Sequence, residues 1–203
     1  MNILTFDLET TGFDPNEDEI IEVGFAVHDE DMTKQSEGGC LVQPDKRIPD
    51  EVVHLTGITN EKVKKEGHPW PAVRSRFREY LRNCDVWCAH NASFDMGFLS
   101  AHMNDTPSPE YVVDTLRVSE RFVPAYVLHS NKLEDIAHFF GVSLQNAHRA
   151  VEDALATANL LDVMMEEIGL SLEDLLGAKP VKLGKYHIGE DPIEALYSGL
   201  SGR

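Results

Sequence analysis

The order of apolar segments along the 203-residue chain constrains its fold more than any other feature. Three runs with strand character come first, at residues 3–9, 20–29 and 38–44. The polar stretch 30–37 favours an antiparallel hairpin between the second and third runs. Short strand-like runs then alternate with helical patterns: strands at 86–90 and 111–115, helices at 71–83, 93–103, 116–122, 131–141 and 148–168. This order predicts an α/β domain built on a mixed sheet.

The C-terminal segment differs in character from the rest of the chain. Five glycines fall between residues 171 and 203, and helical periodicity is weak there. We therefore predict a domain over residues 1–169 and a tail over 170–203 that is partly ordered or serves for docking.

The charge balance limits which ligands the chain can hold. Asp and Glu number 35 against 18 Lys and Arg, giving a formal net charge of −17. This acidity argues against a protein that holds long nucleic acid by charge. It does not argue against a small metal-dependent site that acts on the end of a nucleic-acid strand. Three cysteines form no zinc or disulfide framework, and we see no export signal and no apolar run of about 20 residues. We expect reduced thiols, a cytoplasmic location and no membrane contact.

Two carboxylates interrupt the first apolar strand. Asp7 and Glu9 are alternate residues, so their side chains project from the same face. Like charges this close destabilise each other unless something positive lies between them. The following Thr-Thr-Gly offers a tight turn that brings backbone close to a ligand. The stretch indicates either a solvated face or a metal site.

Two later segments add acids that alone would be ordinary surface or capping residues. Asp95 follows a short buried strand and lies at the start of a helix, where negative groups are favoured. His148 and Asp153 are five residues apart, which on a helix is about 140° beyond a full turn. They can converge only if His148 lies in the turn before the helix and Asp153 within it.

The segments DLETTG, HNASFD and HRAVED, in this order, resemble the DEDDh 3′→5′ exonucleases of the RNase H-like superfamily. The resemblance extends from about residue 2 to 168 and includes HLTGIT, VVDTL and KLEDIAHFFGV. The family includes proofreading subunits of bacterial replicative polymerases and free-standing enzymes such as exonuclease X and RNase T. The resemblance implies an RNase H-like mixed sheet of five strands flanked by helices.

The same resemblance implies a reaction and a set of catalytic residues. Asp7, Glu9, Asp95 and Asp153 would hold two divalent cations, Mg²⁺ or Mn²⁺, and His148 would be the general base. The implied reaction is hydrolysis at the 3′ end of single-stranded DNA, releasing nucleoside 5′-monophosphates.

Substrate contacts are also implied by the resemblance. They would surround the terminal nucleotide and comprise Thr10, Leu55, Thr56, Asn91 and Phe94. Proofreading subunits have a histidine where this chain has Thr56, before Gly-Ile, so the pattern differs at that loop. Phe94 would either stack on a base or pack in the core.

Two other functions stay open at this stage. The catalytic motifs fit equally an exoribonuclease that trims RNA, as RNase T and oligoribonuclease do, because the chemistry is the same. A non-catalytic interaction module would keep the fold without the activity. A polymerase or a second copy of the chain would be the protein partner. The basic segments 62–65 and 74–82 are candidates for a strand-guiding surface.

Overall fold

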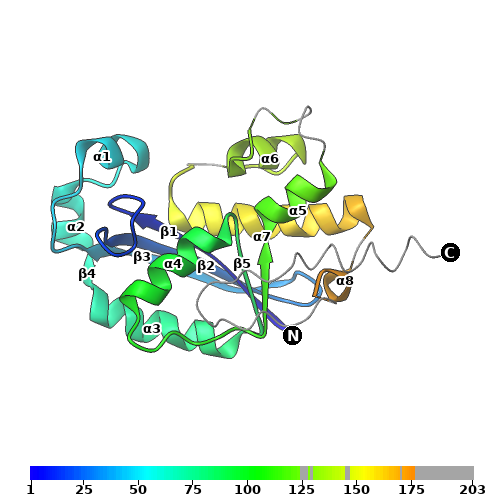
Figure 1. Cartoon of the computed structure of the whole chain (residues 1–203), viewed down its shortest axis with the longest axis horizontal. Coiled ribbons are helices and arrows are strands. Elements are labelled where there is room, and N and C mark those ends of the chain that lie inside the picture. The colour runs from blue at the N-terminus through cyan, green and yellow to red at the C-terminus, as the bar shows by residue number, and fades with distance from the viewer. Residues whose placement is uncertain (124–127, 129, 145–146, 170, 177–203) are drawn as a thin grey trace.

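A six-stranded sheet forms the centre of the computed structural model (Figure 1), which describes residues 1–123, 128, 130–144, 147–169 and 171–176. The strands are β1 (Asn2–Thr10), β2 (Ile20–Asp29), β3 (Lys34–Gln43), β4 (His68–Pro69), β5 (Val86–Ala89) and β6 (Tyr111–Asp114). Their order is β4-β3-β2-β1-β5-β6. β1, β2 and β3 pair antiparallel, whereas β4, β5 and β6 each pair parallel to their neighbours. The predicted mixed α/β sheet is confirmed.

The predicted number of five strands is wrong, because β4 adds a sixth at the edge. It contains only His68 and Pro69, which pair with Val42 and Gln43 at the end of β3. Two residues show no alternation of apolar and polar side chains, so no periodicity reveals them. A proline lacks a backbone N–H, which confines it to an edge position such as this one.

Helices cover both faces of the sheet (Figure 1). The described helices are α1 (Asp50–Thr56), α2 (Asn60–Glu66), α3 (Trp70–Asn83), α4 (Ala92–His102), α5 (Thr115–Phe122), α6 (Leu133–Phe139), α7 (Ala150–Ile168) and α8 (Leu172–Leu176). α3 packs on one face through Val73, Phe77 and Leu81, which recur every four residues, and α4 packs beside it. The core of the other face is formed by side chains of α5, α6, α7 and α8.

Two short helices were not predicted from the sequence. α1 and α2 have seven residues each, too few for a clear apolar period. Val63 of α2 packs against the sheet together with Ile48 and Ile58, which lie in the loops before α1 and α2. α8 lies in the predicted tail, and its three leucines join the core beneath α7. Residues 177–203 lie outside the described residues, so the boundary at 169 and the docking role of the tail stay predictions.

The alternation along β1 decides where its acids point. Leu4, Phe6 and Leu8 pack into the core on the α3 and α4 side of the sheet. Asp7 and Glu9 therefore project from the opposite face, toward α7, which packs closely on β1. None of the described helices is both long and apolar enough to cross a membrane.

Candidate active site

Four carboxylates come from three elements that meet at the C-terminal end of β1. Asp7 and Glu9 lie on β1, partly buried, while Asp95 in α4 and Asp153 in α7 are 2% and 8% exposed. Asp95 accepts a hydrogen bond at Oδ1 from the backbone N–H of Leu8, 3.0 Å away. This contact connects the first turn of α4 directly to the strand that bears the other two acids.

The start of α4 is itself anchored by a residue from β6. Asp114 accepts hydrogen bonds from the backbone N–H groups of Asn91 (2.9 Å) and Ala92 (3.1 Å). Asn91 adopts a left-handed conformation with φ of 65°, which asparagine tolerates better than most residues. The turn that precedes Asp95 is thereby fixed from the neighbouring strand.

His148 lies in the turn before α7, as its convergence with Asp153 required. Its φ is also 65°, and its backbone N–H donates to Oδ2 of Asp153, 3.0 Å away. Ligand atoms of Glu9, His148 and Asp153 all lie within 4.8 Å of one another. The structure thus brings together the predicted histidine and acids from distant parts of the chain.

Burial, followed by repulsion from neighbouring carboxylates, raises the pKa of the acids in this cluster. Burial is the main cause at Asp7, and the charges of Asp95, Glu9 and Asp153 add to it, so its pKa lies well above the usual range. Burial, with the Asp153 and Glu22 carboxylates, raises the pKa of Glu9 to about 8. Burial also raises the pKa of Asp153 to about 6. Without a counter-charge, this cluster opposes its own ionisation at neutral pH.

A buried oxygen in this cluster has no hydrogen-bond partner. Oδ1 of Asp153 is inaccessible to solvent and has no hydrogen-bond partner, whereas Oδ2 accepts a hydrogen bond from the backbone N–H of His148. A buried unpaired carboxylate oxygen is destabilising unless something positive contacts it. Oxygen donors with four negative charges suit hard dications such as Mg²⁺ or Mn²⁺. The residues present therefore fit a divalent metal site.

Comparison with known proteins agrees with this geometry. Residues 4–161 match the RNase_T family model, which describes an exonuclease. The chain belongs to this exonuclease family. It is 38% identical over 161 residues to the PolC-type DNA polymerase III of Clostridium perfringens, and the match covers 78% of this chain but 11% of that protein. It is 32% identical over 163 residues to DNA polymerase III subunit epsilon of Treponema pallidum, covering 79% and 74%.

Solved exonuclease structures share the fold. A structure of exonuclease I superposes with a TM-score of 0.73 at 20% identity, covering 87% of this chain and 42% of that one. Exonuclease X bound to 5′-overhanging duplex DNA superposes with a TM-score of 0.65 at 23% identity, covering 85% and 95%. The RNase H-like fold and the resemblance to the DEDDh exonucleases are confirmed.

Two of the predicted substrate residues have their hydroxyl groups engaged within the exonuclease domain. Thr10 donates to the carbonyl of Gly12 at 2.6 Å. Thr56 is 6% exposed, and its hydroxyl donates to Val52 O and accepts from Ile58 N–H. The structure thus gives both hydroxyls a role in local backbone geometry, and their contact with a nucleotide stays a prediction.

The other predicted substrate residues have more accessible positions. Leu55 is 54% exposed at the end of α1, and Asn91 is exposed at the start of α4. Phe94 packs against the core, with its ring centroid 5.0 Å from that of Phe98. Its ring also lies 6.4 Å from Phe13, which is 87% exposed and was not predicted as a site residue. Phe13 follows the Thr-Thr-Gly turn directly, and that adjacency is the sequence signal that points to it.

Three charged residues around His148 were also missed. Glu22 of β2 forms an ion pair with Arg149, the residue after His148. Glu134 of α6 lies 3.8 Å from His148, measured from Oε1 to Nε2. Glu22 is the one charged residue in the apolar run IIEVGFAV, and that exception was the available signal. Which partner it contacts depends on the fold.

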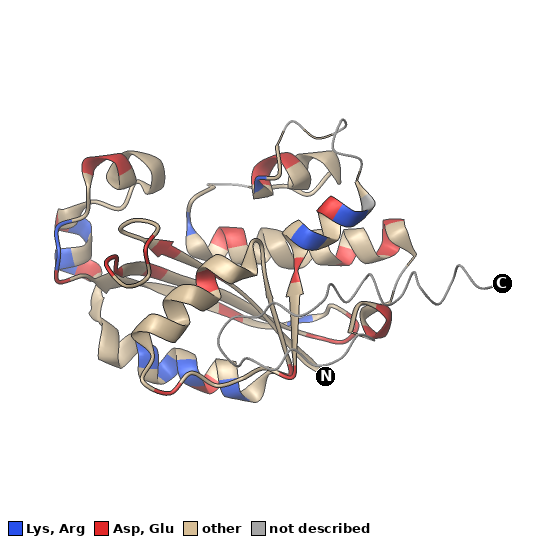
Figure 2. Cartoon of the chain, in the orientation of Figure 1, with Lys and Arg blue, Asp and Glu red and all other residues tan. Residues whose placement is uncertain are grey.

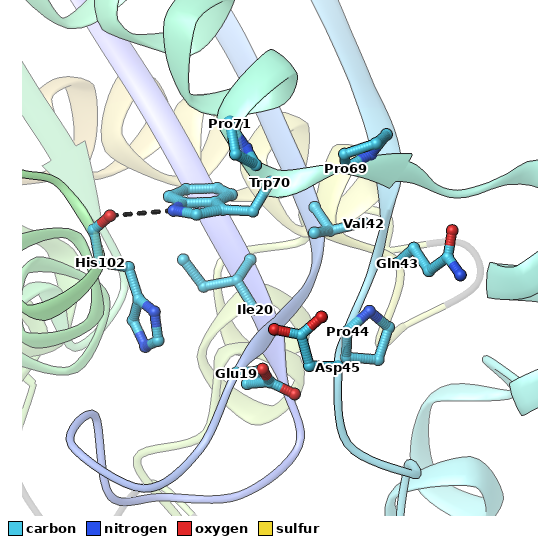
Figure 3. Close-up of a pocket in the computed structure, with 10 residues that line it drawn as sticks. All are labelled: Glu19, Ile20, Val42, Gln43, Pro44, Asp45, Pro69, Trp70, Pro71 and His102. Atoms are coloured by element: carbon cyan, nitrogen blue, oxygen red, sulfur yellow. Dashed lines mark hydrogen bonds between the residues drawn. The ribbon is translucent and has the colours of Figure 1, made fainter.

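A separate pocket of about 490 Å³ lies outside the acid cluster (Figure 3). It is lined by Glu19, Ile20, Val42, Gln43, Pro44, Asp45, Pro69, Trp70, Pro71 and His102. At its wall, Nε1 of Trp70 donates to the carbonyl of His102, 2.9 Å away (Figure 3). Nε2 of His102 in turn lies 2.9 Å from the carbonyl oxygen of Asp18. These contacts connect the end of α4 to the loop that bears Phe13.

The basic segments lie on α2 and α3, where Lys and Arg gather in Figure 2. Arg78 and Arg82 both contact the carboxylate of Asp105, at 3.8 and 3.3 Å. Part of this positive charge is therefore offset within the exonuclease domain. A strand-guiding role for the two segments stays a prediction.

Proposed function

We propose that this protein is a metal-dependent exonuclease that removes nucleotides from the 3′ end of single-stranded DNA and releases nucleoside 5′-monophosphates. The observation that supports it best is the unpaired buried oxygen of Asp153 beside Glu9 and His148. A buried cluster of acids with raised pKa values contributes little to the stability of the fold. A bound cation would favour its ionised form, so the cluster is a candidate cation site.

Each of the four acids would contribute oxygen ligands to the cations. Asp7 and Glu9 would hold them from β1, and Asp153 from the first turn of α7. Asp95 has one oxygen engaged by Leu8 N–H and would act through its other oxygen. When bound, two such cations stabilise negative charge on the phosphate oxygens and lower the pKa of a coordinated water.

His148 is proposed as the general base. Its side chain is 41% exposed, so a ring nitrogen can reach an attacking water, while its backbone is held by Asp153. Taking the proton from that water leaves the imidazole positively charged. Glu134, 3.8 Å from Nε2, would stabilise that charge.

The substrate is proposed to be a strand end rather than a long duplex. Phe13 and Leu55 are exposed apolar side chains, and Phe13 can stack on any base without reading sequence. The net charge of −17 disfavours a long backbone contact but permits a grip on a few terminal nucleotides. Asn91 and Phe94 would complete that grip.

The named relatives support a role in DNA repair or proofreading. One is a PolC-type DNA polymerase III, of which this chain spans 11%, and another is a DNA polymerase III epsilon subunit, of which it spans 74%. A polymerase, or a second copy of the chain, is the proposed protein partner.

The test uses 5′-labelled single-stranded DNA and RNA of one sequence, with Mg²⁺, with Mn²⁺ and with EDTA. Asp7→Ala purified in parallel controls for contaminating nuclease. We expect a metal-dependent ladder that shortens from the 3′ end of DNA and is absent for Asp7→Ala. A ladder mainly on RNA would favour the exoribonuclease, and no digestion of either strand would favour the non-catalytic module.

A further inference from the structure

We propose that Glu22 and Arg149 form a positioning pair that holds His148 in its working place. The inference rests on the proposed function for the role of His148. It assigns no substrate contact to Arg149, although this arginine is the immediate neighbour of the proposed base.

The pair joins a buried carboxylate to an arginine side chain that is 40% exposed, and its geometry is that of a fixed clamp. Nη2 of Arg149 donates to Oε1 of Glu22 at 2.7 Å, and Nε lies 3.2 Å from both carboxylate oxygens. The Glu22 side chain is only 3% exposed. Two arginine nitrogens on one buried carboxylate fix the guanidinium in orientation as well as distance.

The same carboxylate also holds the first residue of α7. Oε2 of Glu22 accepts from the backbone N–H of Ala150 at 3.0 Å. The N-cap residue of this helix is Arg149, whose side chain provides no capping bond, so Glu22 supplies the missing acceptor from β2. The helix dipole at that end adds to the attraction.

These bonds constrain His148 from its C-terminal side. Its own N–H is held by Asp153, and the next two residues are held by Glu22. Between these anchors the His148 backbone has a φ of 65°, which is unfavourable for a residue with a Cβ and persists only where its surroundings impose it.

Two glycines show how closely α7 is seated at this point. A Cβ on Gly24 of β2 would lie 2.0 Å from the carbonyl carbon of Ala150. A Cβ on Gly39 of β3 would lie 2.4 Å from Cγ2 of Val151. Because neither position leaves room for a side chain, the start of α7 contacts the sheet backbone directly, and the ion pair fixes it there.

The pair also connects the backbone around His148 to β1, the strand that bears Asp7 and Glu9. Glu22 is the cross-strand partner of Glu9 in the antiparallel β1–β2 register. A shift of Arg149 toward a substrate phosphate would take the only cationic partner in this contact set away from the buried Glu22 carboxylate and leave it the Ala150 N–H alone, which is unfavourable. If Arg149 instead stays on Glu22 and the pair positions His148 relative to Glu9, all of these contacts are preserved.

The experiment compares the Arg149→Lys single variant with the Glu22→Met/Arg149→Met double variant, which removes both charges and takes the side-chain acceptor away from Ala150 N–H. Arg117→Met on α5 removes an arginine that pairs with Glu120 instead, and it is the matched control. We expect kcat to fall about 10- to 100-fold in the double variant, with KM within twofold of the wild-type value. In Arg149→Lys, which keeps the positive charge, kcat should fall less. In a His148→Ala background the double variant should lose nothing further, because the pair acts through His148.

A several-fold rise in KM with kcat unchanged would overturn the proposal and assign Arg149 to the substrate. A further loss of kcat in the His148→Ala background would overturn it equally. Amide hydrogen exchange of the metal-free protein tests the pair without activity: exchange at Ala150 should quicken at least tenfold in the double variant. If wild type degrades no nucleic acid, the proposed function fails, while unchanged exchange at Ala150 would refute the clamp itself.

Discussion

The backbone N–H of Leu8 donates to Oδ1 of Asp95 at 3.0 Å, across 87 residues of sequence. Leu8 lies between Asp7 and Glu9, so this one bond fixes the distance of the third acid from the first two. One oxygen of Asp95 supports the backbone of β1, and the proposed function gives its charge a second, separable role in the metal site.

Substitutions of Asp95 should separate those roles. Asp95→Asn keeps an oxygen that can accept from Leu8 N–H, whereas Asp95→Ala leaves a buried N–H unpaired. We expect Asp95→Ala to lower the free energy of unfolding by about 1–3 kcal/mol and Asp95→Asn to lower it much less. Both should abolish exonuclease activity. Equal stability of the two variants in urea denaturation would show that the hydrogen bond contributes little.

The metal-free protein should lose stability as pH rises. The pKa of Glu9 is raised from its ordinary 4.5 to about 8 and that of Asp153 from 3.8 to about 6. A raised pKa means that the stabilising contribution is complete below the unfolded value and lost as pH passes the folded value. The free energy of unfolding in EDTA should therefore fall between about pH 4 and pH 8 to 9.

Denaturant titrations at several pH values would measure this fall. Glu9→Gln should flatten the curve between pH 6 and 9, because the group that titrates there is gone. Saturating Mg²⁺ should flatten it in the wild type, because the cations favour the ionised acids. Parallel curves for wild type and Glu9→Gln would contradict the assigned cause.

Removal of the His148 imidazole should stop turnover without emptying the metal site. We expect His148→Asn to lower kcat by about 10²–10⁴-fold, while calorimetric Mn²⁺ binding changes little. Asparagine tolerates a φ of 65°, and its N–H can still donate to Asp153, so it is the matched backbone control for His148→Ala. Near-normal kcat in either variant would remove His148 as the base.

Truncation of Phe13 should affect substrate binding and not stability. Its ring is 87% exposed, so Phe13→Ala should change the free energy of unfolding by less than about 0.5 kcal/mol. Loss of a base-stacking partner is expected to raise KM for single-stranded DNA about 5- to 100-fold. Phe139, 47% exposed on α6, supplies the control substitution Phe139→Ala. The same KM for both variants would exclude Phe13 from the substrate site.

The sequence by itself determined the α/β class, the long elements and the identity of the acids. β1 and α7 have enough residues for a recognisable period of apolar side chains, which follows from backbone geometry, and β2 is a long, almost wholly apolar run. The spacing of His148 and Asp153 even required a turn before α7, which the structure has. The short elements β4, α1 and α2 were not predicted, because an element of two to seven residues is too short to show a period of apolar side chains.

Only the tertiary structure decided which side chains contact one another. Glu22 and Arg149 are separated by 127 residues, and Phe13 and Phe94 lie on different elements. Partners of this kind depend on strand register, on the close seating of α7 against β2 and on the path of loops. Those are set by the packing of the whole chain, because a single residue's chemistry specifies what it can bind but not what lies within reach.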